Sequence, residues 1–585
     1  MAIDQATPSK GPDSAPTPGS SPLRVVVFTA GPLASINQVF FQRLASDPLL
    51  DFRGVIVDEY QRPRKPLVMR LLRGLREEGW PWLWFKVATG LAALIQRAAL
   101  SLFERAHRRR GRDESYETFS RETGISVYRV HDIHQEESLR LIRLLQPQLG
   151  VIVGGRILHD AVTTIPEYGT LNIHKRKVPE YRGGGPMGYW EVLAGERSIG
   201  VTIHYAISQV DAGNILGEAT IPIEECDTLK SLKIKADILG AQLYHDTIRS
   251  VALGLRKGTP QDTSRGKTYR APSEFKVWQL EKHLKQKAAK VMPCLRGRPP
   301  WLVRMRLLVQ YVMLLPLLLA VRKRLRTRHS SPVCIFFYHV VANHPVNHMC
   351  LPFEVFVEQI EFLRRYWAII PLDEAIERLR SGKNDEIAVA ITFDDGYKDN
   401  AWAIEYLRYL GVPATFFISI GHVRNGSSFQ HDLRRGFTDA APLSLTELQR
   451  LASAEFTIGS HGLYHEDFGA LDSEAADHAL RESRRLITEV TGQTPTHFSF
   501  PKGQRVTNIT PDSFALALRH YRYVYSAYGG YNFPCPERRH FLRMGNPVGV
   551  LELAMSMDGY NGYTGLRQCL SGNAWGLKTD ALSPY

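Results

Sequence analysis

Apolar residues recur along this 585-residue chain in two separate α/β patterns. Continuous apolar runs such as 23–29 (LRVVVFT) and 149–155 (LGVIVGG), with helical stretches between them, extend to about residue 270. A second series begins with SPVCIFFYHVV at 331–341 and includes an apolar run at 387–393. Apolar runs that alternate with helical stretches are typical of parallel sheets covered by helices. The pattern therefore predicts two α/β domains.

Changes in composition place boundaries around these domains. Residues 1–22 are rich in Pro, Ser, Gly and Ala and contain no apolar signal region, so we expect a disordered tail. The first domain is expected at 23–274, with a basic and apolar insertion at 62–112. A basic linker at 275–330 leads to the second domain at 331–585. The absence of a signal region favours a cytoplasmic protein.

The net charge of +14 is concentrated in two segments. Residues 62–112 carry 13 Lys/Arg and 3 Asp/Glu, and residues 295–328 carry 9 Lys/Arg and no acidic residue. Each segment contains an apolar run, at 80–103 and at 307–321. As a helix, the second run would be only about 22 Å long, which is shorter than a bilayer core of about 30 Å.

Apolar faces with Trp residues and basic flanks are typical of helices that lie in the interface of an anionic membrane. We therefore expect a protein that is peripheral on the inner face of the membrane, with the leucine-rich run at 307–321 as its interfacial segment. A buried core helix and a membrane-spanning helix are the alternative interpretations. Nucleic acid is a disfavoured partner, because the basic segments are leucine-rich rather than polar with interleaved aromatic residues.

The first half contains three side chains suited to acyl transfer. Asn172 and His174 are two residues apart, so on an extended segment they share one face, and Asp211 follows in DAGNIL. The amide of Asn172 can stabilise an oxyanion, while His174 can move a proton and Asp211 can orient the imidazole. These residue types predict transfer of an acyl group to an amine.

The order of the motifs in this half is more specific than any one of them. N-x-H is followed by P-x-Y-R-G-G-G-P, G-V-T-I-H and D-x-G-x-I-L. This order resembles the 10-formyltetrahydrofolate-dependent formyltransferases, which act on methionyl-tRNA, glycinamide ribonucleotide or amino sugars. The resemblance implies a Rossmann-like domain, the catalytic set Asn172, His174 and Asp211, and 10-formyltetrahydrofolate as formyl donor. The basic stretch KRKV at 175–178 indicates an anionic acceptor, such as a phosphate-linked sugar.

The second half contains carboxylates and histidines in a metal-binding pattern. Asp394 and Asp395 end the apolar run, and Gly396 permits the bend that would give the two carboxylates different roles. His461 and His465 are four residues apart, which on a helical turn places both on one face and suits chelation of one metal. A metal held by two histidines and one carboxylate keeps open positions for water and substrate, and a second carboxylate can accept a proton.

A Pro-Lys-Gly turn formed by Pro501, Lys502 and Gly503 follows another apolar run and could direct backbone N–H groups at an oxyanion. Together these motifs resemble the polysaccharide deacetylases, carbohydrate esterases that remove N-acetyl groups from amino sugars. The resemblance implies a distorted (β/α) barrel with Asp394 as general base. It also implies that the metal ligands are Asp395, His461 and His465 and that the oxyanion is bound by the backbone near Lys502.

The sequence departs from the deacetylase pattern in two features. Ser499 stands where many relatives have an Arg two residues before the motif Pro, and no L-x-x-H-D motif supplies a general acid. The acid is therefore unassigned at this stage. Zinc is the first expected metal, although two His and one carboxylate also suit iron, cobalt or nickel.

The sequence thus predicts a bifunctional enzyme of amino-sugar or polysaccharide modification, a hydrolase of non-peptide carbon–nitrogen amide bonds and a formyltransferase. Deacylation would free an amine, which the first domain would then formylate. The substrate would be an amino sugar, a sugar-nucleotide, a lipid-linked sugar or a polysaccharide. The alternatives are a deacetylase with a non-catalytic formyltransferase-like module, a tRNA formyltransferase with an appended domain, and a membrane scaffold with two vestigial sites.

Overall fold

The computed structural model describes most of the chain, namely residues 21–63, 66–107, 115–255, 258–292, 301–454, 456–504, 507–545, 547, 549–560 and 562–572. It divides into two compact units, and each is described by itself. Unit 1 comprises Met1–Ser101 and Asp113–Lys287, and unit 2 comprises Leu102–Arg112 and Ala288–Tyr585. Apart from its last two residues, the tail predicted at 1–22 lies outside the described residues.

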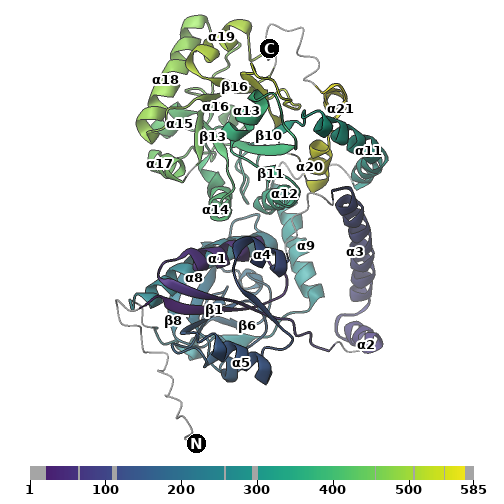
Figure 1. Cartoon of the computed structure of the whole chain (residues 1–585), viewed down its shortest axis with the longest axis vertical. Helices are drawn as coiled ribbons and strands as arrows, with labels where there is room; N and C mark the ends of the chain where they lie inside the picture. The colour runs from purple at the N-terminus through teal and green to yellow at the C-terminus, as the bar shows by residue number, and fades with distance from the viewer. Residues whose placement is uncertain are drawn as a thin grey trace, which may run out of the picture. The chain divides into compact units, whose positions relative to one another are not determined.

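Unit 1 contains a seven-stranded sheet in the order β3-β2-β1-β4-β5-β7-β8 (Figure 1). The first five strands of this order pair in parallel, and β7 and β8 pair antiparallel. The strands are β1 (Leu23–Ala30), β2 (Leu50–Asp58), β3 (Val127–Val130), β4 (Leu149–Val153), β5 (Thr170–His174), β7 (Ser198–Tyr205) and β8 (Ile215–Pro222). A separate two-stranded sheet joins β6 (Tyr181–Gly183) to β9 (Lys267–Tyr269).

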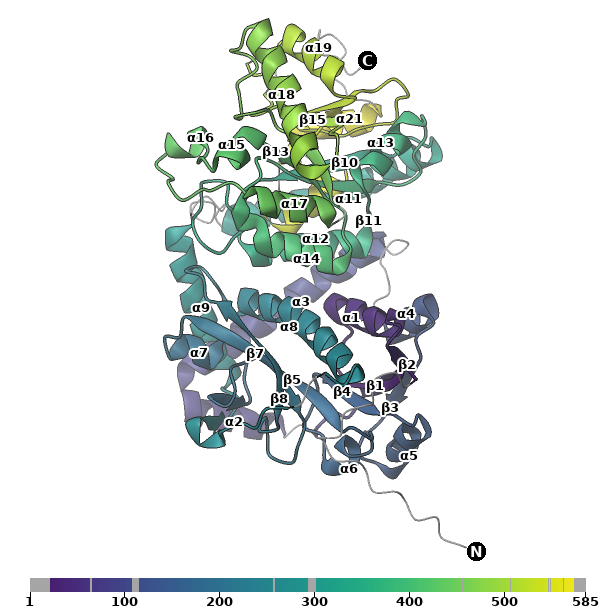
Figure 2. The same cartoon turned by 90° about the vertical axis from the view of Figure 1, so that its left-hand side faces the viewer.

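The helices of unit 1 cover both faces of this sheet, which explains why its central strands are apolar throughout. Helices α1 and α8 lie against one face and α5 against the other (Figures 1 and 2). The helices are α1 (Ser35–Ser46), α2 (Leu67–Glu78), α3 (Trp80–His107), α4 (Tyr116–Thr123), α5 (Glu136–Leu144), α6 (Asp160–Thr163), α7 (Tyr189–Leu193), α8 (Leu229–Ala252) and α9 (Glu274–Val291). The last residues of α3, from Leu102, and of α9, from Ala288, belong to unit 2. The strand order and its coverage confirm the predicted Rossmann-like α/β domain.

Unit 2 contains a parallel sheet whose pairing follows the order β17-β16-β15-β14-β13-β12-β10-β18, with β11 beside β12. Figure 2 shows helices arranged around these strands. The strands are β10 (Val333–Tyr338), β11 (Ala368–Ile369), β12 (Ala388–Phe393), β13 (Thr415–Ile418), β14 (Thr457–Ser460), β15 (His497–Ser499), β16 (Tyr523–Ser526), β17 (His540–Leu542) and β18 (Met544–Gly545). The helices are α11 (Trp301–Thr327), α12 (Phe353–Tyr366), α13 (Leu372–Arg380), α14 (Ala401–Leu410), α15 (Ile420–Asn425), α16 (Gln430–Leu433), α17 (Leu445–Ser453), α18 (Ser473–Thr491), α19 (Pro511–His520), α20 (Val550–Met557) and α21 (Gly562–Ser571).

One short segment joins the two ends of this sheet. β17 pairs with β16, and β18 pairs with β10, yet the two strands are separated in the chain only by Arg543. The segment therefore connects the last strand of the order to the first, which gives the predicted distorted (β/α) barrel. Arg543 stands at the junction, and its side chain is buried.

The structure corrects the predicted length of the leucine-rich segment. The apolar run ends at residue 321, but α11 continues through flanking arginines and has 27 residues. At 1.5 Å per residue this helix is about 40 Å long, so the prediction that it is too short to cross a bilayer is wrong. Over Met305–Thr327 its hydropathy and length match those of a membrane span, a property that core helices of soluble proteins share.

Candidate functional sites

The three side chains predicted for acyl transfer lie together in a pocket of unit 1. Asn172 and His174 project from β5, and Asp211 lies in the loop between β7 and β8 with a left-handed backbone (φ 52°). All three line a cavity of about 730 Å³ together with Gly154 and Gly155, which follow β4. A non-glycine residue with positive φ costs energy and is commonly retained at functional sites.

Asp211 is the centre of this cluster. The Asn172 amide donates to Asp211 Oδ1 at 3.3 Å, and the backbone N–H of Gly183 donates to Oδ2 at 2.9 Å. His174 Nδ1 lies 3.3 Å from Asp211 Oδ2, and His174 Nε2 lies 2.9 Å from the carbonyl of Tyr181. Burial lowers the pKa of His174, although the charge of Asp211 acts in the opposite direction. Burial raises the pKa of Asp211, but the hydrogen bond from His204 and the charge of His174 outweigh it.

Sequence reasoning missed His204 as a member of this site. His204 lies opposite Asn172 in the β5–β7 register, and its Nε2 is 3.3 Å from the Asn172 amide nitrogen and 3.5 Å from Asp211 Oδ1. The signal was present in the motif G-V-T-I-H, which ends at this histidine. The pocket therefore contains two histidines around one carboxylate.

The expectation that KRKV recognises an anionic acceptor is wrong for those residues. Lys175 is paired with Asp237, and Lys177 with Glu196 at 2.9 Å. The buried Arg176 donates to the carbonyl oxygens of Gly184 and Pro186, both at 3.0 Å, and so holds the glycine-rich turn. The stretch is basic because it stabilises the fold. The cations that line the pocket are instead Arg62, Arg156 and Arg270.

In unit 2 the two adjacent aspartates lie at the carboxyl end of β12. Asp394 continues the extended strand, and its N–H donates to the Tyr338 carbonyl at 2.9 Å. The chain then turns, because Asp395 has φ 72° and Gly396 has φ 91°. This bend separates the two carboxylates and gives them different neighbours, as the predicted division of roles requires. His465 and Lys502 are also left-handed, with φ 58° and 60°.

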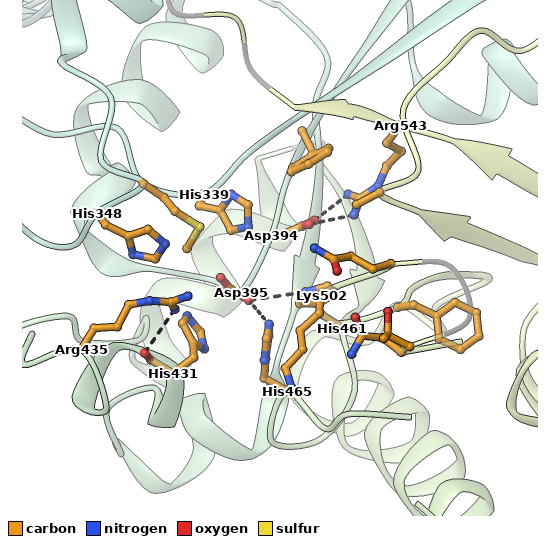
Figure 3. A pocket seen from close by; sticks show the side chains of 17 residues that line it. His339, His348, Asp394, Asp395, His431, Arg435, His461, His465, Lys502 and Arg543 are labelled. Atoms are coloured by element: carbon orange, nitrogen blue, oxygen red, sulfur yellow. Dashed lines mark hydrogen bonds and ion pairs between the residues drawn. The ribbon is translucent and has the colours of Figure 1, made fainter. Parts of the chain in front are cut away.

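Asp395, His461 and His465 offer three ligand atoms within 4.8 Å of one another (Figure 3). Both histidine Nε2 atoms lie 3.4 Å from Asp395 Oδ1. His461 Nδ1 lies 2.8 Å from the Ser499 carbonyl, which leaves Nε2 to face the carboxylate. Neither buried oxygen of Asp395 has a hydrogen-bond partner among the described residues. A divalent cation fits this set, since a buried carboxylate requires a partner and the donors suit zinc.

The charges around Asp395 also favour a cation. Burial raises the pKa of Asp395, and the neighbouring carboxylates Asp394 and Asp432 raise it further. Burial lowers the pKa of His461 to about 4 and that of His465 well below its ordinary value, so both imidazoles are neutral, as ligands must be.

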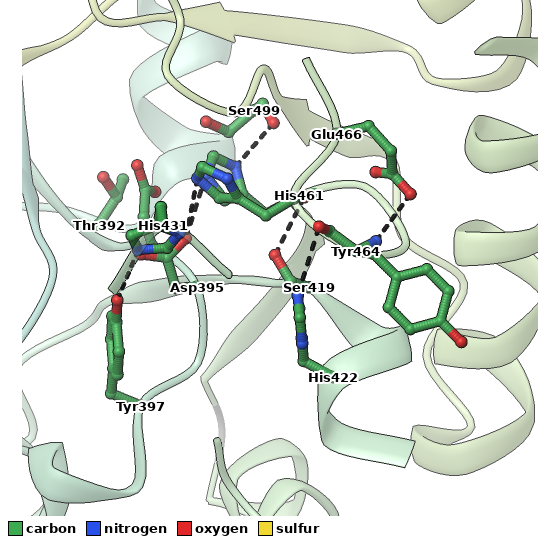
Figure 4. A network of polar contacts seen from close by, with 12 residues as sticks. Thr392, Asp395, Tyr397, Ser419, His422, His431, His461, Tyr464, Glu466 and Ser499 are labelled. Carbon is green, nitrogen blue, oxygen red and sulfur yellow. Dashed lines mark hydrogen bonds and ion pairs between the residues drawn. The ribbon is translucent and has the colours of Figure 1, made fainter. Parts of the chain in front are cut away.

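The two histidines do not share a helix, which corrects the predicted helical turn. His461 directly follows β14, and His465 lies in the loop beyond it. The loop returns to the site through Gly462 and His465, which both have positive φ, while Glu466 accepts hydrogen bonds from two backbone N–H groups of the turn. Figure 4 shows His461 between the carbonyl of Ser499 and Asp395. The four-residue spacing indicated a common ligand site, but a turn produces it.

Arg543, which the motifs did not identify, holds the second carboxylate. Its guanidinium donates to Asp394 Oδ1 at 2.6 Å and to Oδ2 at 2.8 Å. It also donates to Ser499 Oγ at 2.6 Å and to Thr392 Oγ1 at 3.1 Å. Burial alone would raise the pKa of Asp394, but the charge and hydrogen bonds of Arg543 lower it to about 2. Asp394 is therefore ionised at neutral pH.

The surrounding pocket has a volume of about 480 Å³ and contains three further histidines, His339, His348 and His431 (Figure 3). His431 Nε2 is hydrogen-bonded to the Tyr397 hydroxyl oxygen at 2.9 Å, and that hydroxyl donates to Asp432 at 2.6 Å. His339 directly follows β10, and its backbone carbonyl accepts from the Asn400 amide at 2.7 Å, whereas its imidazole makes no hydrogen bond to another residue that the structure describes. Burial lowers the pKa of this imidazole to about 4. These residues are the candidates for the acid that the motifs left unassigned.

The predicted oxyanion turn lines the same pocket. Pro501 and Gly503 flank Lys502, and the Gly503 N–H donates to the Pro501 carbonyl at 2.6 Å. The Lys502 ammonium is held by Asp467 Oδ2 at 2.7 Å, so its charge is compensated. The backbone of Lys502, rather than its side chain, is therefore the part of this turn available to a substrate oxygen.

Fold and site together define two classes of domain. Unit 1 is an α/β domain with an Asn–His–Asp cluster suited to acyl transfer, and unit 2 is a parallel (β/α) barrel with an Asp–His–His site suited to metal-assisted hydrolysis. In agreement, residues 102–248 match the formyl transferase family and residues 381–521 match the polysaccharide deacetylase family. The chain therefore carries a formyltransferase domain and a polysaccharide deacetylase domain, as the motif order predicted.

Individual relatives resemble one domain at a time. Methionyl-tRNA formyltransferases of Macrococcus caseolyticus and Staphylococcus aureus are 33% and 31% identical over 181 and 183 residues, which is 30% of this chain. The chain spans 56% of the length of these relatives. Among solved structures, the Streptococcus pyogenes deacetylase PplD in complex with acetate is 16% identical, with a TM-score of 0.31 over 37% of this chain and 94% of that chain. A sugar N-formyltransferase from a Shewanella species is 14% identical, with a TM-score of 0.27 over 42% of this chain and 76% of that chain.

Proposed function

We propose that this protein modifies the amino group of an amino sugar at two sites, by metal-dependent hydrolysis of an N-acyl group in unit 2 and by formyl transfer from 10-formyltetrahydrofolate in unit 1. The observation that carries the proposal is the division of roles at Asp394 and Asp395. One carboxylate is paired with Arg543, and the other faces two histidines without a hydrogen bond. This arrangement supplies a base and a metal site side by side.

In the hydrolase, Asp395, His461 and His465 would hold the metal, with zinc as the first candidate. When bound, the metal polarises the amide carbonyl and makes water more acidic. Asp394, kept ionised by Arg543, takes a proton from the attacking water. The Lys502 N–H stabilises the oxyanion. Burial lowers the pKa of His339 to about 4, so its imidazole is neutral at rest and passes to the leaving amine the proton that Asp394 took from the water. The carbon–nitrogen bond breaks, and a free amine and a carboxylate result.

In the formyltransferase, the acceptor amine attacks the formyl carbon of the donor. The Asn172 amide donates to the oxygen on which negative charge develops. His174 donates from Nε2 to the Tyr181 carbonyl and accepts the proton of the amine at Nδ1, where Asp211 Oδ2, 3.3 Å away, stabilises the resulting imidazolium. The new carbon–nitrogen bond forms as the bond to the folate nitrogen breaks. Exposed Ile157 and Ile207, beside the pocket glycines, provide an apolar wall for the donor's flat ring.

A sugar-nucleotide or lipid-linked amino sugar is the proposed substrate. The amine that unit 2 releases is the group that unit 1 would formylate, so deacylation precedes formylation in the proposed order. Arg62 and Arg270, which line the unit 1 pocket without an ion pair to another described residue, support an anionic acceptor. We further propose that the reaction takes place in the cytoplasm, because the formyl donor is supplied there, and on the inner face of the membrane.

The test uses the purified full-length protein with zinc, an N-acetylated amino-sugar nucleotide and 10-formyltetrahydrofolate, and follows product masses. We expect the free amine first and the formamide second. Asp394→Asn should remove the first product, and Asn172→Ala should remove only the second. No change in substrate mass with metal and donor present would contradict the proposal.

A tRNA acceptor is the second candidate, because the curated relatives at 31–33% identity are methionyl-tRNA formyltransferases. Charged initiator tRNA in place of the sugar discriminates between the two. If tRNA is formylated while the amino sugar is not, unit 1 is a tRNA enzyme. A unit 1 that binds an amino sugar but formylates neither acceptor would be a binding module.

A further inference from the structure

Helix α11 of unit 2 has two apolar faces, and only one of them is covered. Its buried face follows a helical spacing and consists of Tyr311, Leu315, Leu318, Val321 and Leu325. These side chains pack into unit 2, so this half of the helix belongs to the core of that unit. A helix with a single apolar stripe would be polar on its other side.

The opposite face of α11 is apolar and exposed. Met305, Val309, Met313 and Leu317 recur every four residues along it, and Met313 is 76% exposed. Arg306 and Lys323 lie at the two ends of this stripe, and both are exposed. An exposed apolar stripe with a cation at each end is the pattern of a helix that lies in a membrane interface.

A buried polar cluster fixes α11 to its unit. Asp558 accepts from the Tyr311 hydroxyl at 2.5 Å and from Arg322 at 2.6 Å, and His107 Nε2 lies 2.9 Å from it. Burial raises the pKa of Asp558, but the hydrogen bond and charge of His107, together with Arg322, outweigh it. If α11 left this position to cross a bilayer, the buried carboxylate of Asp558 would lose its hydrogen bonds from Tyr311 and Arg322. The buried face of α11 therefore stays on unit 2, and only the exposed stripe is available to lipid.

Unit 1 has a comparable stripe of its own on α3. Trp80, Trp84, Val87, Leu91 and Leu94 are exposed at alternating spacings of four and three residues, and Trp84 is 73% exposed. The other side of α3 is attached to α9 of the same unit, where Phe85 packs on Phe275 and Trp278. Thus α11 packs one face on unit 2 and α3 packs one face on unit 1, and each helix leaves an apolar face exposed.

We propose that the exposed stripes of α11 and α3 lie in the interface of an anionic lipid surface, with α11 parallel to the membrane and not across it. The charge of the chain selects this partner, because segments 62–112 and 295–328 contribute +10 and +9. Anionic lipids attract such segments, and exposed Trp residues sit at the headgroup level. This inference deepens the membrane association of the proposed function and is independent of its catalysis.

The experiment is co-sedimentation of the full-length protein with vesicles of phosphatidylcholine alone or with added phosphatidylglycerol. Binding should be at least about tenfold stronger to the anionic vesicles and should weaken as salt is raised. Leu317→Glu on the exposed stripe should reduce binding by about tenfold, because it adds repulsion and removes an apolar contact. The matched variant Leu445→Glu, on the partly exposed start of α17, should bind as the original protein does.

Hydrolysis of a short soluble N-acetyl sugar separates this inference from the catalytic proposal. Leu317→Glu should retain that activity, so a loss of membrane binding alone supports the interfacial face. Equal binding by Leu317→Glu and the original protein would overturn the proposal, as would a stable dimer that Leu317→Glu dissociates. Arg306→Cys and Lys323→Cys, if they react with an impermeant thiol reagent from opposite sides of a vesicle, would show a spanning helix and contradict the proposal.

Discussion

The guanidinium of Arg543 donates a hydrogen bond to each oxygen of the Asp394 carboxylate, although the two residues are 149 positions apart in the chain. The same guanidinium donates to Ser499, the position at which many polysaccharide deacetylases have an arginine. Arg543 stands at the junction of β17 and β18, where the sheet is joined into a barrel. The cation that supports the base therefore comes from the barrel junction instead of the motif turn.

Arg543→Ala should leave a buried carboxylate without its partner. Breaking a buried ion pair costs about 3–5 kcal/mol of the free energy of unfolding, and hydrolysis should fall because Asp394 no longer stays ionised and oriented. Urea unfolding and hydrolysis of an N-acetyl sugar measure the two effects. Arg519→Ala, an exposed arginine of α19, is the control and should change neither.

The pH dependence of the same pair has a definite sign. The folded-state pKa of Asp394 is about 2, below its ordinary 3.8, so the pair contributes stability that is present above about pH 4 and is lost as the pH falls toward 2. In Arg543→Ala, burial would instead raise the pKa of Asp394, and the acid limb of the hydrolysis profile should move to higher pH. An unmoved limb would show that Arg543 does not hold the base.

Removal of the metal should destabilise unit 2. Chelation should lower the melting temperature, and zinc at 100-fold excess over its Kd should restore about 2.7 kcal/mol of stability. Asp395→Asn should lose the bound metal, because the carboxylate is one of three ligands. Metal analysis of the purified variants checks this, with the exposed Asp512→Asn as the matched control. Full metal content in Asp395→Asn would place the ion elsewhere.

Asp211→Asn should change the pH profile of formyl transfer as well as its rate. Burial holds the pKa of His174 below 6.5, and Asp211 partly restores it. His174 acts as a base, so activity should fall as the pH drops through that pKa. Loss of the Asp211 charge lowers the pKa of His174 further, so the acid limb of the profile should move to lower pH. A plot of kcat/KM against pH measures this shift. Asp262→Asn, exposed in the same unit, should leave the limb in place.

His339→Asn and His431→Asn distinguish the candidates for the general acid. Loss of a general acid typically costs about 10²–10⁴ in rate, so His339→Asn should lose at least about 100-fold in kcat. The Nε2 of His431 is hydrogen-bonded to the Tyr397 hydroxyl, so His431→Asn should lower kcat by less if His431 only positions its neighbours. A substrate with a good leaving group needs less protonation and should rescue His339→Asn selectively. Equal losses and no rescue would contradict this assignment.

Several features were predictable because they depend on neighbours in the chain. The apolar runs predicted β1, β4, β10 and β12 to within a few residues, since a buried parallel strand must be apolar throughout. The motif order predicted both domains, and Asp395, His461 and His465 meet in the structure. The length of α11 was not predictable from its apolar run, because the flanking arginines are also helical and reach solvent or an ion pair.

The sequence by itself determined the two domain types, the reactive side chains and the bend at Gly396, because each depends on local composition or on a fixed motif order. Only the tertiary structure decided which charged side chains lie at the two sites and which are paired elsewhere in the fold. It paired Lys175 and Lys177 within the fold, brought His204 beside Asn172 through antiparallel register, and placed Arg543 on Asp394. It also showed that a turn, not a helix, joins His461 to His465. These relationships depend on contacts between distant segments, which spacing along the chain does not encode.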